Sequence, residues 1–277
     1  MTNASVFKTP ESREKIRARY AEILAAFPFR QRYVDTAFGR TFALEAGAPD
    51  APAAVLLHGS CSNSAFWFPE ILALSGAFRV LAVDILGEAG NTDGERPDLR
   101  SGAYADWLAQ ALDALGAREA MVAGNSLGGW VALRFAAAYP GRVRKLALIA
   151  AAGLAPVRPE FLQRTNDSGT SGETPQMDAS VTGGAALPPE VEEFIRLILW
   201  GYNPIREELP PLTDAQLARI TIPVLFVAGR EDNLIDTAAS AQRLREYVPG
   251  ARVRLLENTG HMVPDTVEHL LPFFMEG

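Results

Sequence analysis

MVAGNSLGGW, residues 121–130, is the stretch of this sequence that decides the fold. The apolar run at 120–123 is typical of a buried strand, and it leads directly into a Gly-x-Ser-x-Gly pattern at 124–128. A helical pattern follows, so the serine lies in a sharp turn between a strand and a helix. Such a turn strains the serine backbone and requires small neighbours, which the glycines supply. We therefore predict that the Ser126 hydroxyl stands above a sheet, at a helix N-terminus whose N–H groups stabilise negative charge.

Strands and helices alternate on both sides of this stretch. The alternation predicts an α/β fold with a mostly parallel central sheet and helices on both of its faces. A hairpin with its turn at Gly39 is expected to precede the parallel strands. Continuous apolar runs predict the buried strands themselves, at 53–57, 79–83, 120–123, 143–150, 223–228 and 251–257.

The alternation stops between 153 and 221, which we interpret as a helical cap inserted between two strands of the sheet. The core is then formed by 31–152 and 222–277, and residues 1–30 form an N-terminal helical arm. Thr9-Pro10-Glu11 is a helix-start signal in that arm. The arm suits a contact in a homodimer or a wall beside the mouth of a site, and the sequence leaves both open.

Composition excludes several classes of protein. The 277 residues are 48% hydrophobic and carry a net charge of −7, which argues against sequence-independent binding of nucleic acid. The single cysteine, Cys61, allows no internal disulfide and suits a reducing cytoplasm, where we expect the protein. Residues 1–20 show no signal-peptide pattern, and no run approaches the ~20 apolar residues of a membrane span. The three histidines and one cysteine lack metal-ligand spacing, so we expect neither metal nor cofactor.

Four residues with chemically useful side chains or amides are expected at the same edge of the sheet. Ligands of open parallel sheets bind beyond the carboxyl ends of the strands. By the assignment above, Ser60, Ser126, Asp232 and His261 all follow strand ends. This convergence predicts a site at that edge.

A serine hydroxyl is a weak nucleophile and needs a base within hydrogen-bond reach, oriented by a third group. His261 is the predicted base, because it follows Gly260 in a loop after the last strand. His58 precedes Gly59 and is interpreted as a structural residue that holds its loop. His269 lies within the final helix and is interpreted as a surface residue.

Asp232 is the predicted orienting acid, because it follows a strand and precedes His261 in the chain. Asp236 better suits the N-cap of the helix that begins at Thr237. Glu231 can simply face solvent, and Asp84, at another strand end, is the outside candidate.

Negative charge on a tetrahedral intermediate needs preorganised donors, worth about 3–4 kcal/mol each. The backbone N–H of Leu127, the residue after the nucleophile, is one predicted donor. The other is expected from the loop after His58-Gly59, with Ser60 as first choice and Cys61 as second. Cys61 is also the alternative nucleophile, but no further histidine is evidently free to activate it.

These residues together resemble an α/β-hydrolase with a serine nucleophile, over about 33–274. The resemblance rests on four segments in the family's order, with serine first, then acid, then histidine. It implies the α/β-hydrolase fold, Ser126 as nucleophile, His261 as base and Asp232 as its partner. It also implies an oxyanion hole from the Ser60 and Leu127 amides, and a variable cap. The four segments are His58-Gly59, the turn at 124–129, Gly229-Arg230-Glu231-Asp232 and Gly260-His261.

Within this family the chain looks most like the small bacterial carboxylesterases, through its N-terminal arm, the segment 83–87 and Gly128-Gly129-Trp130. Asn125-Ser126 also resembles the hydrolases that cleave carbon–carbon bonds of ring-cleavage products. Those enzymes usually carry tryptophan directly after the catalytic histidine, where this chain has Met262. Dehalogenases and epoxide hydrolases of the fold place aspartate at the turn, and Ser126 disfavours them.

We therefore expect a serine hydrolase that cleaves small-molecule carboxylic esters through an acyl-enzyme. The alternatives are carbon–carbon or amide hydrolysis by the same triad, and a weakly catalytic binding or receptor protein that keeps the triad. The cap is expected to set selectivity, with 167–189 as a mobile lid. Tyr202 is a further aromatic candidate for the pocket wall; the same side chains can instead pack the cap against the sheet. The other predicted pocket residues are Cys61, Phe161, Phe194, Trp200 and Met262.

Overall fold

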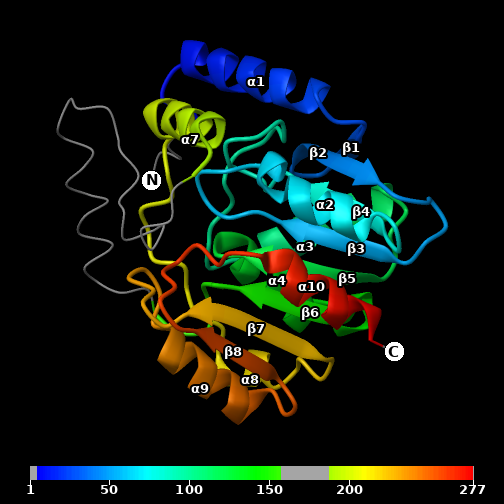
Figure 1. Ribbon diagram of the computed structural model, residues 1–277, viewed down its shortest axis with the longest axis vertical. Helices are drawn as coiled ribbons and strands as arrows, with labels where there is room; N and C mark the ends of the chain where they lie inside the picture. Colours follow the sequence, from blue (N-terminus) through cyan, green and yellow to red (C-terminus); the bar gives the residue numbers. More distant parts are fainter. Residues whose placement is uncertain (1–4, 157–186, 277) are drawn as a thin grey trace.

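A computed structural model describes residues 5–156 and 187–276 of the chain. Its centre is an eight-stranded sheet in the order β1-β2-β4-β3-β5-β6-β7-β8 (Figure 1). β1 and β2 form the predicted hairpin, β2 runs antiparallel to β4, and all pairs from β4 to β8 are parallel. This arrangement confirms the predicted α/β-hydrolase fold. The strands are β1 Arg30–Thr36, β2 Gly39–Ala46, β3 Ala53–Leu57, β4 Arg79–Val83, β5 Ala120–Asn125, β6 Val143–Ile149, β7 Val224–Gly229 and β8 Arg252–Leu256.

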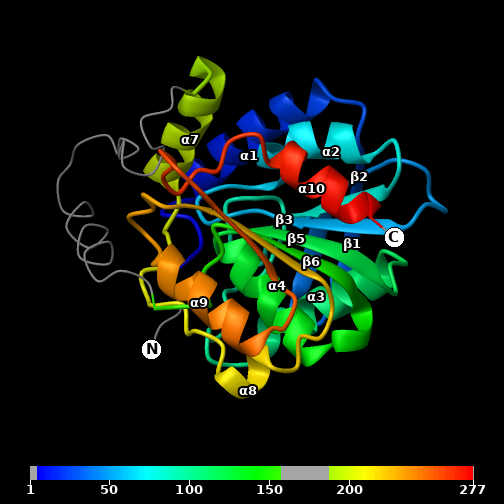
Figure 2. The same ribbon diagram turned by 60° about the horizontal axis from the view of Figure 1, so that its bottom comes forward.

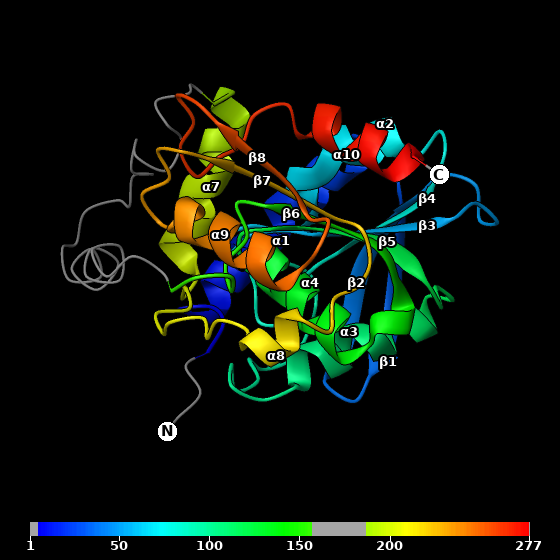
Figure 3. The ribbon, with the colours of Figure 1, turned by 90° about the horizontal axis from the view of Figure 1, so that it is seen from below.

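Helices cover both faces of the sheet, because successive side chains of a strand point to opposite faces. In β3, Val55 and Leu57 join a core with α3, α4 and α9, whereas Ala54 and Leu56 join a second core with α2 and α10. Figure 3 shows α2 and α10 on one side of the sheet and α3 and α4 on the other. The helices are α1 Pro10–Ala25, α2 Phe68–Leu74, α3 Ala103–Ala114, α4 Leu127–Ala138, α7 Pro189–Gly201, α8 Asp214–Leu217, α9 Thr237–Tyr247 and α10 Thr266–Met275, with 3-10 turns at Ser64–Trp67 (η1) and Pro140–Arg142 (η2).

α1 packs on α7, a helix far from it in the sequence. Figures 1 and 2 show α1 beside α7. The segment before α1 is bonded to the end of α7, since the Lys8 N–H donates to the Gly201 carbonyl at 2.9 Å. The Ser12 hydroxyl donates to the same carbonyl, also at 2.9 Å. These bonds tie the end of α7 to α1 and to the segment before it.

Asp84 anchors the arm at the carboxyl end of β4. One oxygen of this fully buried carboxylate accepts hydrogen bonds from the Tyr20 hydroxyl of α1 at 3.1 Å and from the Ser64 N–H at 2.8 Å. The other accepts from the Asn91 N–H at 2.7 Å. Asp84 therefore serves the scaffold, and its oxygens are occupied by groups other than a histidine.

Side-chain oxygens hold the starts of two helical segments. The 3-10 turn η1 precedes α2, and the Asn63 side chain caps it by accepting the Ala65 N–H. α3 begins at Ala103, whose N–H donates to the Ser101 hydroxyl at 3.2 Å. Within the described ranges, no helix combines the length and apolarity that a membrane span needs.

The Tyr20 hydroxyl gives a direct test of this anchor. Tyr20→Phe removes one hydrogen bond to a buried carboxylate, and we expect the free energy of unfolding to fall by about 1.5–3 kcal/mol. Tyr33→Phe is the matched control, because both rings pack on Phe42, with centroids 6.0 Å and 5.0 Å away, but Tyr33 is 45% exposed. Urea unfolding measures both variants. Equal effects in the two would contradict the anchoring role of Tyr20.

Candidate active site

Ser126 sits in the predicted strained turn between β5 and α4. Its backbone has φ 52° and ψ −112°, in the region that residues with a side chain rarely adopt. Close packing enforces this conformation: a Cβ on Gly124 would lie 2.3 Å from the Gly128 carbonyl oxygen, and one on Gly128 would lie 2.1 Å from that of Leu57. The Ser126 N–H also donates to the Ile149 carbonyl of β6 at 2.9 Å. The glycines are thus required by the close packing around the serine.

The hydroxyl of Ser126 is joined to His261 and Asp232 by a continuous chain of hydrogen bonds. The His261 Nε2 lies 3.0 Å from Ser126 Oγ, and the His261 Nδ1 lies 2.8 Å from one carboxylate oxygen of Asp232. A carboxylate only accepts, so Nδ1 carries the proton and Nε2 presents its lone pair to the serine hydroxyl. The three predicted residues therefore meet with the geometry of a nucleophile, its base and the group that orients the base.

The Asp232 carboxylate is held ready for this role. Its second oxygen accepts the N–H groups of Leu234 at 2.8 Å and Ile235 at 3.0 Å. Burial alone would raise the pKa of Asp232, but the hydrogen bond and charge of His261, with these two amides, outweigh it and lower the pKa. The carboxylate therefore stays ionised at neutral pH and fixes the histidine ring.

The loops after β7 and β8 carry Asp232 and His261, and they are tied to each other. The Glu231 N–H donates to the Thr259 carbonyl at 3.0 Å. A Cβ on Gly229 would lie 2.0 Å from that carbonyl oxygen, so only glycine allows the approach. The competing acids take the positions predicted for them, because Asp236 caps α9 by accepting the Ala239 N–H at 2.9 Å and Glu231 is exposed.

The loop after β3 lies against the serine. A Cβ on Gly59 would lie 3.5 Å from Ser126 Cβ. The His58 Nε2 accepts the Ile85 N–H at 2.9 Å, so its Nδ1 carries the proton and donates to the Gly59 carbonyl at 2.7 Å. Burial lowers the pKa of His58, against the opposing charge of Asp84, and favours this neutral ring. His58 thus holds its loop, as interpreted from the sequence.

Two backbone N–H groups near Ser126 in the fold are candidates for the predicted donors, those of Ser60 and Leu127. The Gly59 carbonyl is fixed by His58 and by the Ser62 hydroxyl at 2.7 Å, and in a trans peptide the Ser60 N–H points the opposite way. None of the described residues accepts a hydrogen bond from the Ser60 N–H. Leu127 is the first residue of α4, so its N–H has no partner inside the helix. The oxyanion-hole role of these two amides stays a prediction.

Cys61 is unsuited to either of its alternative roles. Its N–H donates to a carboxylate oxygen of Glu88 at 3.1 Å, which leaves Ser60 as the loop's donor. Burial, with the Glu88 charge, raises the pKa of the Cys61 thiol to about 12. The thiol is therefore protonated at neutral pH and is a poor nucleophile.

Glu88 itself was missed in the sequence, where it lies in a glycine-rich loop without periodicity. Its side chain is 1% exposed, and burial raises the pKa of its carboxyl to about 7, against the opposing charge of Arg96. The available signal was a charged residue between Gly87 and Gly90, just after a buried strand.

The predicted pocket residues have different surroundings. Phe194 is buried and packs between Tyr20 and Phe66, with ring centroids 6.2 Å and 6.0 Å away, so it joins α7 to the arm and the core. Met262, beside His261, is 36% exposed. Tyr202 is fully buried after α7. Phe161 and most of the predicted lid at 167–189 lie outside the described residues.

Trp200 lies on the outer side of α7. It is 42% exposed, and the Lys15 ammonium of α1 lies 5.3 Å from its ring centroid. The apolar face of α7 is formed by Phe194, Ile195 and Ile198, and the helical period turns Trp200 away from that face. Trp200 therefore packs where α1 and α7 meet, and its place in a pocket wall stays a prediction.

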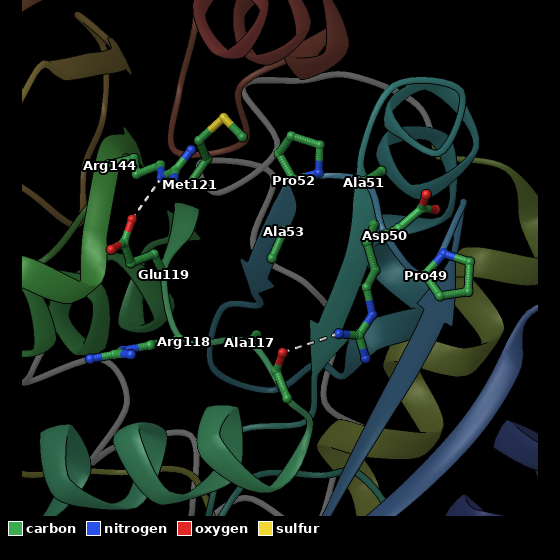
Figure 4. Close-up of a pocket in the computed structure, with 12 residues that line it drawn as sticks. Pro49, Asp50, Ala51, Pro52, Ala53, Ala117, Arg118, Glu119, Met121 and Arg144 are labelled. Atoms are coloured by element: carbon green, nitrogen blue, oxygen red, sulfur yellow. Dashed lines mark hydrogen bonds and ion pairs between the residues drawn. The ribbon is translucent and has the colours of Figure 1, made fainter.

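A cleft of about 410 Å³ lies at the other edge of the sheet (Figure 4). It is formed where β3, β4 and β6 begin, and Arg144 and Glu119 form an ion pair of 2.9 Å beside it. Its lining contains no serine, cysteine or histidine. The hydrogen-bonded Ser126, His261 and Asp232 lie at the opposite, carboxyl edge, where ligands of this sheet class bind. In 5–156 and 187–276, no group of three or more His, Cys, Asp or Glu residues is placed to hold a metal ion.

Comparison with known proteins assigns the class. Residues 54–269 match the model of the alpha/beta hydrolase family, and the chain belongs to this family.

Its relatives in Bacillus subtilis include two proteins named as carboxylesterases. The chain is 29% identical to the uncharacterized carboxylesterase nap over 88% of this chain and 85% of that protein. It is 28% identical to carboxylesterase YbfK over 93% of this chain and 90% of that protein. The crystal structure of carboxylesterase CesB (YbfK) matches with a TM-score of 0.82, at 28% identity, over 96% of this chain and 99% of that one. The predicted resemblance to small bacterial carboxylesterases is confirmed.

The packing of the turn can be tested by adding one methyl group. Gly124→Ala places a carbon 2.3 Å from the backbone of Gly128, and overpacking of this kind costs about 1–3 kcal/mol or more. We expect a lower urea midpoint, together with loss of any activity that depends on Ser126. Gly141→Ala is the control, because no atom lies within 4 Å of the added carbon. If Gly124→Ala unfolds at the parent's midpoint, the close packing of the turn is refuted.

Proposed function

We propose that this protein is a serine esterase that hydrolyses carboxylic esters of small molecules through an acyl-enzyme. The observation that carries the proposal is the hydrogen-bond chain from Ser126 through His261 to Asp232, with distances of 3.0 Å and 2.8 Å. The relatives named as carboxylesterases support an ester as the substrate.

In the first half of the proposed reaction, His261 Nε2 takes the proton of the Ser126 hydroxyl as Oγ attacks the ester carbonyl carbon. The carbonyl π electrons move to oxygen, and the resulting oxyanion accepts the N–H groups of Ser60 and Leu127. Each such donor contributes about 3–4 kcal/mol to the transition state. Collapse of the intermediate breaks the bond to the alcohol, which leaves with the proton from His261.

In the second half, the same imidazole takes a proton from water, whose oxygen attacks the acyl-enzyme carbonyl. A second oxyanion forms in the same place and collapses, and Ser126 Oγ leaves with the proton from His261. The carboxylic acid is released and the serine is restored. Asp232 remains a carboxylate throughout, because its role is to orient the imidazole and stabilise its protonated form.

The proposal has two further parts. The first is that the protein acts in the cytoplasm, a location that its single cysteine suits. The second is that 153–221 acts as a cap, whose helix α7 is held by α1 and limits the substrates that reach Ser126.

Replacing the nucleophile tests the function. Ser126→Ala should lower kcat for p-nitrophenyl butyrate by roughly 10⁵–10⁶-fold, the scale of triad loss in serine hydrolases. A fluorophosphonate probe should label Ser126 in the folded parent protein. Ser75→Ala is the control, because the Ser75 hydroxyl only bonds the Leu72 carbonyl in an exposed turn.

Three results would reject the esterase. A Ser126→Ala variant as active as the parent would show that Ser126 is not the nucleophile. Turnover of amides or vinylogous diketones without turnover of simple esters would show that the same triad cleaves another kind of bond. A Ser126 that the probe leaves unlabelled would indicate a binding protein.

A further inference from the structure

Glu88 is a buried carboxylate beside the loop that supplies Ser60 to the proposed oxyanion hole. It follows β4, its side chain is 1% exposed, and it contacts no residue of the triad through a hydrogen bond or ion pair between described residues. Burying a carboxylate is costly unless hydrogen bonds compensate. The groups that donate hydrogen bonds to Glu88 therefore indicate its role.

One oxygen of Glu88 bonds the loop at two successive residues. It accepts the Ser60 hydroxyl at 3.2 Å and the Cys61 N–H at 3.1 Å. Cys61 has φ 56°, in the left-handed region that non-glycine residues rarely adopt, and such a conformation persists only when the surroundings enforce it. Hydrogen bonds to a charged acceptor are about twice as strong as neutral ones. Glu88 thus supplies two hydrogen bonds to this strained turn.

The peptide between Gly59 and Ser60 is then fixed from both ends. His58 and Ser62 hold the Gly59 carbonyl, each at 2.7 Å, and Glu88 holds the Ser60 side chain and the next amide. With both ends held, the Ser60 N–H cannot turn without breaking one set of bonds. An oxyanion donor acts on the transition state only when it is aimed in advance.

We propose that Glu88 is a positioning residue, which aims the Ser60 N–H at the oxyanion by clamping the Ser60–Cys61 turn. The inference rests on the proposed function for its catalytic consequence, but the clamp itself can be measured without any substrate.

The groups around Glu88 suit a carboxylate that titrates near neutrality. Arg96 lies nearby, with its guanidinium 5.0 Å from the Tyr202 ring centroid, and its charge favours the ionised form. Tyr202, after α7, and Tyr104, on α3, lie near the carboxyl, and its charge contributes to the raised pKa of both phenols.

The raised pKa of Glu88 also makes folding depend on pH. Because folding raises the pKa of this carboxyl to about 7, the folded chain binds its proton more tightly than the unfolded chain does. This carboxyl therefore favours folding most at acidic pH, and its contribution falls as pH rises through about 7.

The test compares Glu88→Ala with Glu88→Gln, whose side-chain oxygen can still accept a hydrogen bond. With p-nitrophenyl butyrate, Glu88→Ala should lower kcat by roughly 10–100-fold with KM nearly unchanged, because a misaimed donor weakens the transition state and not substrate binding. Glu88→Gln should retain kcat within about 10-fold of the parent's. Inhibition by a trifluoromethyl ketone, whose adduct carries an oxyanion, should weaken in parallel with kcat/KM.

Cys61 supplies a second readout that needs no catalysis. It is the chain's single cysteine, so iodoacetamide alkylation reports on this turn alone. In Glu88→Ala the released turn and the lost negative charge should raise the alkylation rate at least about 10-fold. Glu45→Gln is the matched control, because Glu45 is also 1% exposed but bonds Arg79, which begins β4, at 2.7 Å. It should alter neither kcat nor Cys61 alkylation.

Ser60→Ala covers the case in which Glu88→Ala fails to fold, because Ser60 is exposed and its truncation leaves no cavity. It removes one of the two clamp bonds and should give smaller changes in the same directions. Unchanged kcat and unchanged alkylation in folded Glu88→Ala, or in Ser60→Ala, would overturn the inference while leaving a Ser126-dependent esterase intact. If the parent hydrolyses no ester, the proposed function fails, and Cys61 alkylation still decides whether Glu88 holds the turn.

Discussion

Ser126 is held in a backbone conformation that its own side chain disfavours, and much of the molecule is arranged to enforce it. β5 and α4 meet without room for a Cβ at Gly124 or Gly128, and β3 closes the turn from the other side. The strain is small beside the apolar burial of two continuous cores. Its effect is to lift one hydroxyl out of the sheet, at a helix start and within reach of loops from other strands.

The remaining parts of the site come from parallel strands whose carboxyl ends share that edge. The loop after β3 brings the Ser60 amide, the loop after β7 brings Asp232, and the loop after β8 brings His261. Each loop is itself fixed by hydrogen bonds: His58 holds the first, and the Glu231 amide joins the other two. Such fixed donors and acceptors act without reorganisation during a reaction, which is where electrostatic catalysis gains most.

Local patterns predicted much of this from the sequence. The strands at 53–57 and 79–83 and the helix at 237–247 have the predicted bounds, because apolar runs and turn residues act over short distances. Gly124, Ser126 and Gly128 specify their own turn for the same reason. The N-cap role of Asp236 followed from its position alone.

Features that depend on which distant segments meet were not predictable in this way. α1 and the segment before it pack on α7, through bonds between Lys8, Ser12 and Gly201. Trp200, near the end of α7, lies beside Lys15 of α1. Glu88 lies in a loop without periodicity, and its partners at 60 and 61 are distant in sequence. Only the folded chain shows what these residues contact.

The central claim is that Ser126 becomes covalently acylated during turnover, and the acyl-enzyme can be trapped directly. The protein is mixed with p-nitrophenyl butyrate, quenched in acid during the steady state, digested and analysed by mass spectrometry. We expect a butyryl ester on Ser126 that forms as fast as p-nitrophenol is first released. Turnover with an unmodified Ser126, or with the butyryl group on Cys61, would contradict it.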